Sequence, residues 1–379
     1  MPATRPLRSH HPSKGARCVW PHRTRPFRRD HASGIHPRSD RPAFPARAFS
    51  STSSRPDRRW LLRLPVEDGS DLGEQNDPIT PANRLEKWLL RSLEKKTVVL
   101  PAFPTMASRL VDALESPDVE VETVEEIISQ DGSITAQVIR ASNSVYYGAA
   151  CPAQDLHQAI MRIGFRETAN VAMLAASRTL FEMEDRAELS CFPDLWPRLW
   201  QSSLVCAFGA NLLSREIKLG NPSHVFLSAT LRDVGSLLIL KLLAAGLVHG
   251  RLRDKPSEEQ LRDLFDHLHT RLGADYLREN RMPEYVIDVA ERHHLLDLPF
   301  AHDTILIHLI RCADGLCERI GVTPFPEETD ESACETEPGI SPAAQESASL
   351  LGIDDARLEY FTLQFEGIRE QVGGLMDAP

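Results

Sequence analysis

Histidine and aspartate residues in the second half of the chain are the side chains whose types could do chemistry. They are His267, His269, His293, His294 and Asp314. Imidazole and carboxylate groups bind metal ions and carry protons. The same residues have ordinary alternatives, because a histidine can be solvated on an amphipathic helix or sit at a helix C-terminus, where the dipole favours positive charge. Asp314 could likewise pair with Arg311, three residues earlier on a helix.

Other catalytic patterns are missing from the sequence. The pair Gly373-Gly374 has no lysine after it and therefore does not make a phosphate-binding loop. There is no G-x-S-x-G nucleophile motif, and no cysteine has an adjacent base. Aromatic residues make up 6% of the chain, which provides no stacking platform for single-stranded nucleic acid.

The charge of the chain is unevenly distributed. Residues 1–60 contain 14 Lys and Arg against 3 Asp and Glu, whereas the remaining residues contain 29 against 51. Because the folded part is acidic, we expect no binding to nucleic acid. Overall, 42% hydrophobic and 26% charged residues are typical of a globular protein and exclude a fibrous or wholly disordered one.

Cysteine usage and hydropathy bear on the compartment. The seven cysteines form no C-x-x-C pair, and Cys312 and Cys317 lie about 140° apart around a helix, so they cannot share a metal from one face. We expect reduced thiols and a cytoplasmic protein. The longest apolar run, Ser236 to Val248, is interrupted by Lys241 and is shorter than the roughly 18 residues of a membrane span. It predicts a buried helix and no membrane crossing.

Residues 1–80 predict a disordered, Arg/Pro-rich extension. The first sixty residues contain nine prolines and five histidines without any helical or strand period, so they cannot bury enough apolar surface to fold. Two alternatives remain: a start assigned too far upstream, or an organellar transit peptide ending near Arg47-Ala48-Phe49-Ser50-Ser51, since such peptides are rich in Arg and poor in acids.

From about Pro81 onward, apolar residues recur at spacings of three and four, which predicts an all-α fold. One example is Leu85, Trp88, Leu89 and Leu93. Further helices are expected over 166–183, 194–218, 223–245, 257–280, 283–297 and 302–321. Residues 324–349 predict an acidic linker, and 350–379 a C-terminal helix.

Two stretches resemble a known bacterial family. The first begins Leu100-Pro101-Ala102-Phe103-Pro104, continues through Gln130-Asp131 and Ile134-Thr135, and ends with Ala141-Ser142-Asn143-Ser144 and Tyr147-Gly148. The second is Phe226-Leu227-Ser228-Ala229-Thr230-Leu231-Arg232-Asp233-Val234-Gly235. Together they resemble the HDOD domain, the "HD-related output domain". By residue type alone, Asp131 is expected to cap a helix N-terminus, and Asn143 and Gly148 are expected to end a helix. The alternative to these structural roles is that the first stretch forms a partner-binding surface.

The resemblance implies an HDOD domain over 95–300. It divides into an N-terminal helical subdomain (95–188) and a C-terminal HD-like subdomain (189–300), with the seam near 184–193 and a closing helix over 301–323. A protein of this family is expected to work in signal transduction through an unknown signalling protein partner, since no second output domain is recognisable in the chain.

The resemblance also implies a degenerate HD site. HD hydrolases bind metal through histidines and aspartates on several helices, and the metal activates water against phosphate esters. The corresponding positions are Ser202, Arg232, Asp233, His269, His293, His294 and Asp314. Serine and arginine replace two ligands, and a guanidinium repels a divalent cation and favours pairing with Asp233 or Asp314.

We therefore expect no catalytic residues, no cofactor and no bound metal. If a metal were retained, Asp233, His269, His294 and Asp314 would hold it. The leading interpretation is a non-catalytic regulatory protein that acts by protein contacts or by sensing a ligand, such as a nucleotide, in the degenerate pocket. The alternative is a divergent metal-dependent phosphohydrolase acting on a nucleotide or cyclic dinucleotide.

Overall fold

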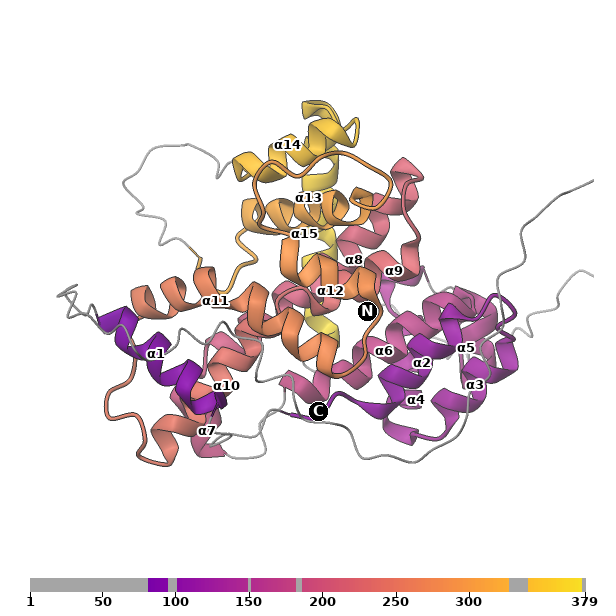
Figure 1. The fold of residues 1–379 in the computed structure, drawn as a ribbon. Helices are drawn as coiled ribbons and strands as arrows, with labels where there is room; N and C mark the ends of the chain where they lie inside the picture. Colours follow the sequence, from indigo (N-terminus) through magenta and orange to yellow (C-terminus); the bar gives the residue numbers. More distant parts are fainter. Residues whose placement is uncertain (1–80, 95–100, 149–150, 182–185, 327–339, 377–379) are drawn as a thin grey trace, which may run out of the picture. The chain divides into compact units, whose positions relative to one another are not determined.

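The computed structural model describes residues 81–94, 101–148, 151–181, 186–326 and 340–376. Every regular element in these ranges is helical, which confirms the all-α prediction (Figure 1). The helices are α1 (Pro81–Glu94), α2 (Thr105–Glu115), α3 (Val121–Ser129), α4 (Gly132–Ser142), η2 (Val145–Tyr147), α5 (Leu156–Ile163), α6 (Phe165–Phe181), α7 (Arg186–Cys191), α8 (Leu195–Ile217), α9 (Pro222–Leu231), α10 (Val234–Val248), α11 (Glu258–Glu279), α12 (Glu284–Arg292), α13 (Ile305–Arg319), α14 (Pro342–Leu350) and α15 (Asp355–Met376). The expected disordered extension, residues 1–80, lies outside the described residues.

The expected helix over 223–245 is two helices, α9 and α10, which meet at Arg232 and Asp233. Asp233 has φ −103° and ψ 21°, outside the helical region, and its carbonyl accepts a hydrogen bond from Ser236 N at 3.0 Å. No proline or glycine stands at positions 232 and 233, so the apolar pattern predicts one unbroken helix. The break corrects the expected single helix, and it turns both polar side chains into a buried cluster.

The expected linker over 324–349 is also corrected, because its last part is α14. Pro342 occupies the first turn, where a missing N–H costs nothing. Ala344 and Ala348 are buried, and a Cβ on Gly315 of α13 would lie 2.4 Å from the Ala344 Cβ. Small side chains therefore let α14 pack closely on α13, a contact that no apolar periodicity indicates.

The motif residues around α4 have the capping roles that their types predict. The Asp131 carboxylate accepts hydrogen bonds from the backbone N–H groups of Ser133 (2.8 Å) and Ile134 (3.0 Å). Asn143 follows the last turn, donating to the Ala153 carbonyl at 2.9 Å and accepting from the Ala153 N–H at 2.7 Å. The motif thus fixes the exit of α4 and the loop before α5.

Two hydrophobic clusters hold the described helices together. The first joins α2–α6 to α1, α10 and α11, and the second joins α8 and α9 to α13, α14 and α15. Leu180 and Leu195, on either side of the predicted seam at 184–193, both belong to the first cluster. The division into subdomains at that seam remains a prediction.

Helix α10 is the most apolar helix and is buried along most of its length. Figure 1 shows α1 beside it, and a Cβ on Gly246 would lie 2.4 Å from the Trp88 ring of α1. Among the described residues, no helix combines the length and apolar character that a membrane crossing requires.

Two glycines allow α10 and α11 to cross at very short range. A Cβ on Gly235 would lie 1.9 Å from the carbonyl oxygen of His269, and one on Gly273 would lie 3.1 Å from Gly235 N. Real Cβ atoms do not approach backbone that closely, so Gly235 must lack a side chain. This crossing brings His269 next to Asp233.

A buried carboxylate connects α6, α8 and η2. Glu167 is 4% exposed and accepts hydrogen bonds from Tyr147 OH at 2.9 Å and Arg215 Nη2 at 2.6 Å. Asn211 Nδ2 adds a third donor at 3.2 Å. The network satisfies the buried charge and gives the motif residue Tyr147 a structural role.

Candidate functional site

The residues expected at the degenerate site come from separate helices and are gathered by the fold. Ser202 lies on α8, Arg232 and Asp233 at the α9–α10 junction, His269 on α11, His293 and His294 just after α12, and Asp314 on α13. Apart from His294, they form two groups that share Asp233. We call Ser202, Arg232, Asp233 and Asp314 the arginine cluster, and Asp233, His269 and His293 the histidine triangle.

Arg232 is at the centre of the arginine cluster and is 1% exposed. Its Nε donates to Asp314 Oδ1 at 2.8 Å, and its Nη2 lies 2.6 Å from the same oxygen. Nη2 also lies 3.0 Å from Asp233 Oδ2 and donates to Ser202 Oγ at 2.8 Å. Nη1 donates to the Ala229 carbonyl at 3.1 Å. One guanidinium thus engages both carboxylates and Ser202.

The charged groups of this cluster keep one another ionised. Burial alone would lower the pKa of Arg232, but Asp233 and Asp314 outweigh it and raise that pKa well above its ordinary value. Burial alone would raise the pKa of Asp233, but Arg232 and the histidines hold it well below its usual range. The arginine is therefore cationic and Asp233 anionic at neutral pH.

The histidine triangle brings two imidazole nitrogens and one carboxylate oxygen to one point. His269 Nδ1 lies 2.5 Å from the Phe265 carbonyl, and His293 Nδ1 lies 2.9 Å from the Val289 carbonyl. Because a carbonyl oxygen only accepts, both Nδ1 atoms carry a proton and donate it, and the Nε2 atoms of both rings face Asp233 Oδ1. The two Nε2 atoms are 3.4 Å apart and lie 3.8 Å (His269) and 3.3 Å (His293) from Asp233 Oδ1.

These separations fit a metal ion. With bonds of about 2.0–2.1 Å to nitrogen, tetrahedral ligand atoms lie about 3.4 Å apart. His294 adds a fourth ligand atom, and the four atoms all lie within 4.8 Å of one another. Nδ1 donation to a carbonyl is the arrangement that orients histidine ligands. By geometry and donor chemistry, the histidines and Asp233 fit a zinc-like ion.

This group differs from the metal set expected from the sequence. Asp314 was expected as a ligand, but it binds Arg232, and among the described residues the ligand group contains His293 instead. The Asp314–Arg311 pair, an alternative in the sequence, is replaced by the Asp314–Arg232 pair. The physical reason is that α9 brings the buried Arg232 to α13.

The histidines differ in their surroundings. Burial lowers the pKa of His269, although Asp233 opposes the shift. His294 is exposed on one side, and the protein packed around its other side, together with neighbouring His293, lowers its pKa to about 4. At neutral pH His269 and His294 are therefore uncharged, and their nitrogens are free of an extra proton.

Comparison with known families gives one match. The family model of the HDOD domain matches residues 100–296, more than half of the chain. The match ends before α13, α14 and α15 and begins after α1.

Three solved structures share the fold. An HDOD domain protein of unknown function from Geobacter sulfurreducens is 21% identical with a TM-score of 0.56, covering 77% of this chain and 99% of that one. A candidate metal-dependent phosphohydrolase from Shewanella amazonensis SB2B is 21% identical (TM-score 0.54; 76% and 98%). A candidate signal transduction protein from Marinobacter aquaeolei VT8 is 19% identical (TM-score 0.55; 79% and 67%).

A curated relative, an uncharacterized protein from Treponema pallidum (strain Nichols), is 23% identical over 220 residues. The match covers 56% of this chain and 40% of that protein. At these identities the likeness establishes the fold, and the chemistry must be argued from this chain's own residues.

Proposed function

The chain belongs to the HDOD family, and we propose that it is a non-catalytic member that works in signal transduction through contacts with a protein partner. The observation that carries this proposal is the buried Arg232 side chain, which engages Asp233, Asp314 and Ser202 together. A solved structure of the same fold carries the description of a candidate signal transduction protein, which supports this class of function.

Arg232 takes the structural role of a metal cation but cannot perform the chemistry of a metal. It neutralises the two carboxylates and links α8, the α9–α10 junction and α13. A guanidinium stays protonated and only donates hydrogen bonds, so it cannot hold or activate a nucleophilic water as a metal does. The cluster therefore stabilises a scaffold whose activity is binding.

The loop after α12 is the surface where we place the partner contact. It begins at the histidines and carries exposed apolar side chains: Leu295 (50% exposed), Leu296 (75%) and Phe300 (45%). Exposed apolar side chains close together are typical of protein interaction sites. A contact at this loop would lie next to His294 and would respond to a ligand that binds at the histidines.

A second candidate function is a divergent metal-dependent phosphohydrolase acting on a nucleotide or cyclic dinucleotide. The histidine triangle favours it, because two oriented Nε2 atoms and Asp233 Oδ1 lie 3.3–3.8 Å from one another, at separations that a metal ion could bridge. When bound, a metal would supply an activated water and charge stabilisation for a phosphate ester. In that case His269, His293, His294 and Asp233 would hold the ion, and Arg232 would orient Asp233 through its other oxygen.

Metal content of the full-length protein, purified without chelator or metal-binding tag, separates the two functions. We expect no stoichiometric Mn, Fe or Zn and no hydrolysis of a phosphodiester such as bis-p-nitrophenyl phosphate. The double variant Ser202→His with Arg232→His restores two ligand types, and we expect it to gain metal because the triangle is already oriented. Near-stoichiometric metal together with hydrolysis of the phosphodiester in the wild type, both lost in His293→Ala, would instead support the hydrolase candidate.

A further inference from the structure

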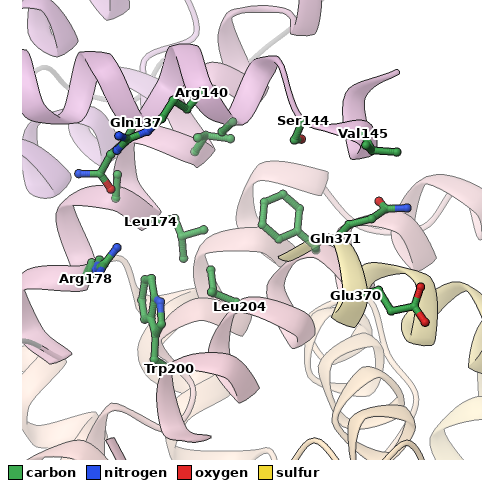
Figure 2. Close-up of a pocket in the computed structure, with 14 residues that line it drawn as sticks. Gln137, Arg140, Ser144, Val145, Leu174, Arg178, Trp200, Leu204, Glu370 and Gln371 are labelled. Carbon is green, nitrogen blue, oxygen red and sulfur yellow. The ribbon is translucent and has the colours of Figure 1, made fainter. Parts of the chain in front are cut away.

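A cavity of about 630 Å³ lies away from the histidines, between α4, α6, α8 and the end of α15 (Figure 2). Its volume is in the range of pockets that enclose a small organic ligand. None of the residues of the arginine cluster or the histidine triangle is among the described residues that line it. It is therefore a separate site, and an inference about it does not depend on the proposed function.

The cavity has an apolar floor. Val171 and Leu174 of α6 and Leu204 and Phe208 of α8 line it and are buried by the surrounding helices. Figure 2 shows Leu174 and Leu204 between the two ends of the cavity. Such a floor favours a ligand with an apolar chain or ring, because covering it removes apolar surface from water.

The rim is polar, and its charges are separated. Arg140 of α4 and Arg178 of α6 lie on one side, with Gln137 beside them, whereas Glu370 and Gln371 of α15 lie on the opposite side (Figure 2). Among the described residues that line the cavity, two arginines face one carboxylate. The arginine side therefore favours an anionic head group.

We propose that this cavity binds an amphipathic organic acid, with its apolar body on the Leu174–Phe208 floor and its carboxylate at Arg140 and Arg178. Helix α15 supplies the opposite wall and lies outside the residues that the HDOD model matches. Phe361 and Phe365 are fully buried and anchor α15; a Cβ on Gly209 of α8 would lie 2.3 Å from the Phe365 ring.

The test uses two fluorescent probes on the full-length protein. Dansyl-undecanoic acid has the apolar chain and the carboxylate, and dansyl-undecanol has the same chain without charge. We expect the acid to bind at one site with a blue-shifted emission, to be displaced by laurate, and to bind about tenfold more tightly than the alcohol at low salt. Equal affinity for the two probes would overturn the proposal.

Two variants and one control locate the binding. Arg140→Glu is an exposed substitution and should weaken the acid about tenfold while leaving the affinity for the alcohol unchanged. Ala175→Trp fills the cavity and should remove binding of both probes, with folding checked by circular dichroism. Arg91→Glu on α1 makes the same charge change away from the cavity and should alter neither affinity. Unchanged acid binding in Arg140→Glu, or retained binding in folded Ala175→Trp, would refute the site.

Discussion

Arg232 is the residue whose surroundings determine what the rest of the site does. It stands one position before Asp233, and its guanidinium contacts Asp233 Oδ2 while the histidines face Oδ1. The two oxygens of one carboxylate therefore serve two groups of opposite character. Because Asp233 is shared, histidines that could bind a metal lie next to an arginine that neutralises the same carboxylate without one.

Substitution of Arg232 by Met should lower the free energy of unfolding by about 3 kcal/mol, because two largely buried carboxylates lose their partner. Urea denaturation of the two proteins measures the difference. The control is the double variant Arg232→Met with Asp314→Asn, in which the second change should cost less than it does in the wild type. A neutral effect of Arg232→Met would remove the support for arginine as a structural replacement for a metal.

At the scale of helices, the crossing of α10 and α11 decides where His269 lies. Asp233 is at the start of α10, and Gly235 follows within its first turn. Because the Gly235 position touches the carbonyl of His269, the histidine side chain is held beside the aspartate. A metal-ligand geometry thus depends on a residue without a side chain.

Gly235→Ala should destabilise the protein by about 2–3 kcal/mol, since the new methyl would lie 1.9 Å from backbone and the helices must separate. Thermal and urea unfolding measure the effect. Gly132→Ala at the start of α4 is the matched control, because a Cβ there has no atom within 4 Å, and it should be close to neutral. Equal effects of the two substitutions would show that α10 and α11 do not need the close crossing.

At the scale of the whole molecule, helices outside the family-matched region complete the protein. α1 packs on α10 and α11, and α14 and α15 pack on α13 and α8. The second hydrophobic cluster therefore includes residues such as Phe361 and Phe365, which lie beyond residue 296. Because these helices pack on one another, we expect them to unfold together. Protonation of the histidines should therefore change the unfolding free energy of all the described helices.

In the metal-free protein, His269 and His294 should lower the unfolding free energy as pH decreases from about 6.5 toward 4, whereas Glu318, whose pKa burial and Asp314 raise to about 7, acts in the opposite direction. Folding lowers the pKa of His269 below 6.5 and that of His294 to about 4, so the unfolded chain binds protons that the folded one does not. Asp233, whose pKa is held low, stabilises the fold above its unfolded pKa of about 4, and that contribution is lost only at lower pH.

Urea unfolding in chelator at several pH values measures this dependence. The variant His294→Gln should flatten the curve between about pH 6.5 and 4, whereas His302→Gln, at an exposed histidine, should leave it unchanged. Equal slopes in the two variants would contradict the assignment of a pH dependence to the histidines around Asp233.

Sequence by itself determined the all-α class, the capping role of Asp131 and the residue types of the site. These properties are local: spacings of three and four residues follow from helix geometry, and capping needs only neighbouring backbone N–H groups. The position of most described helices, including α8, α11 and α13, follows from the same periodicity.

Tertiary structure alone decided the break between α9 and α10, the place of His293 in the histidine triangle and the pairing of Asp314 with Arg232. It also decided the cavity closed by α15. Each depends on which helix faces meet and at what distance, and local periodicity does not encode this. The close crossing at Gly235 and the burial of Arg232 set those contacts, because backbone sterics and the desolvation of charge act between segments far apart in the chain.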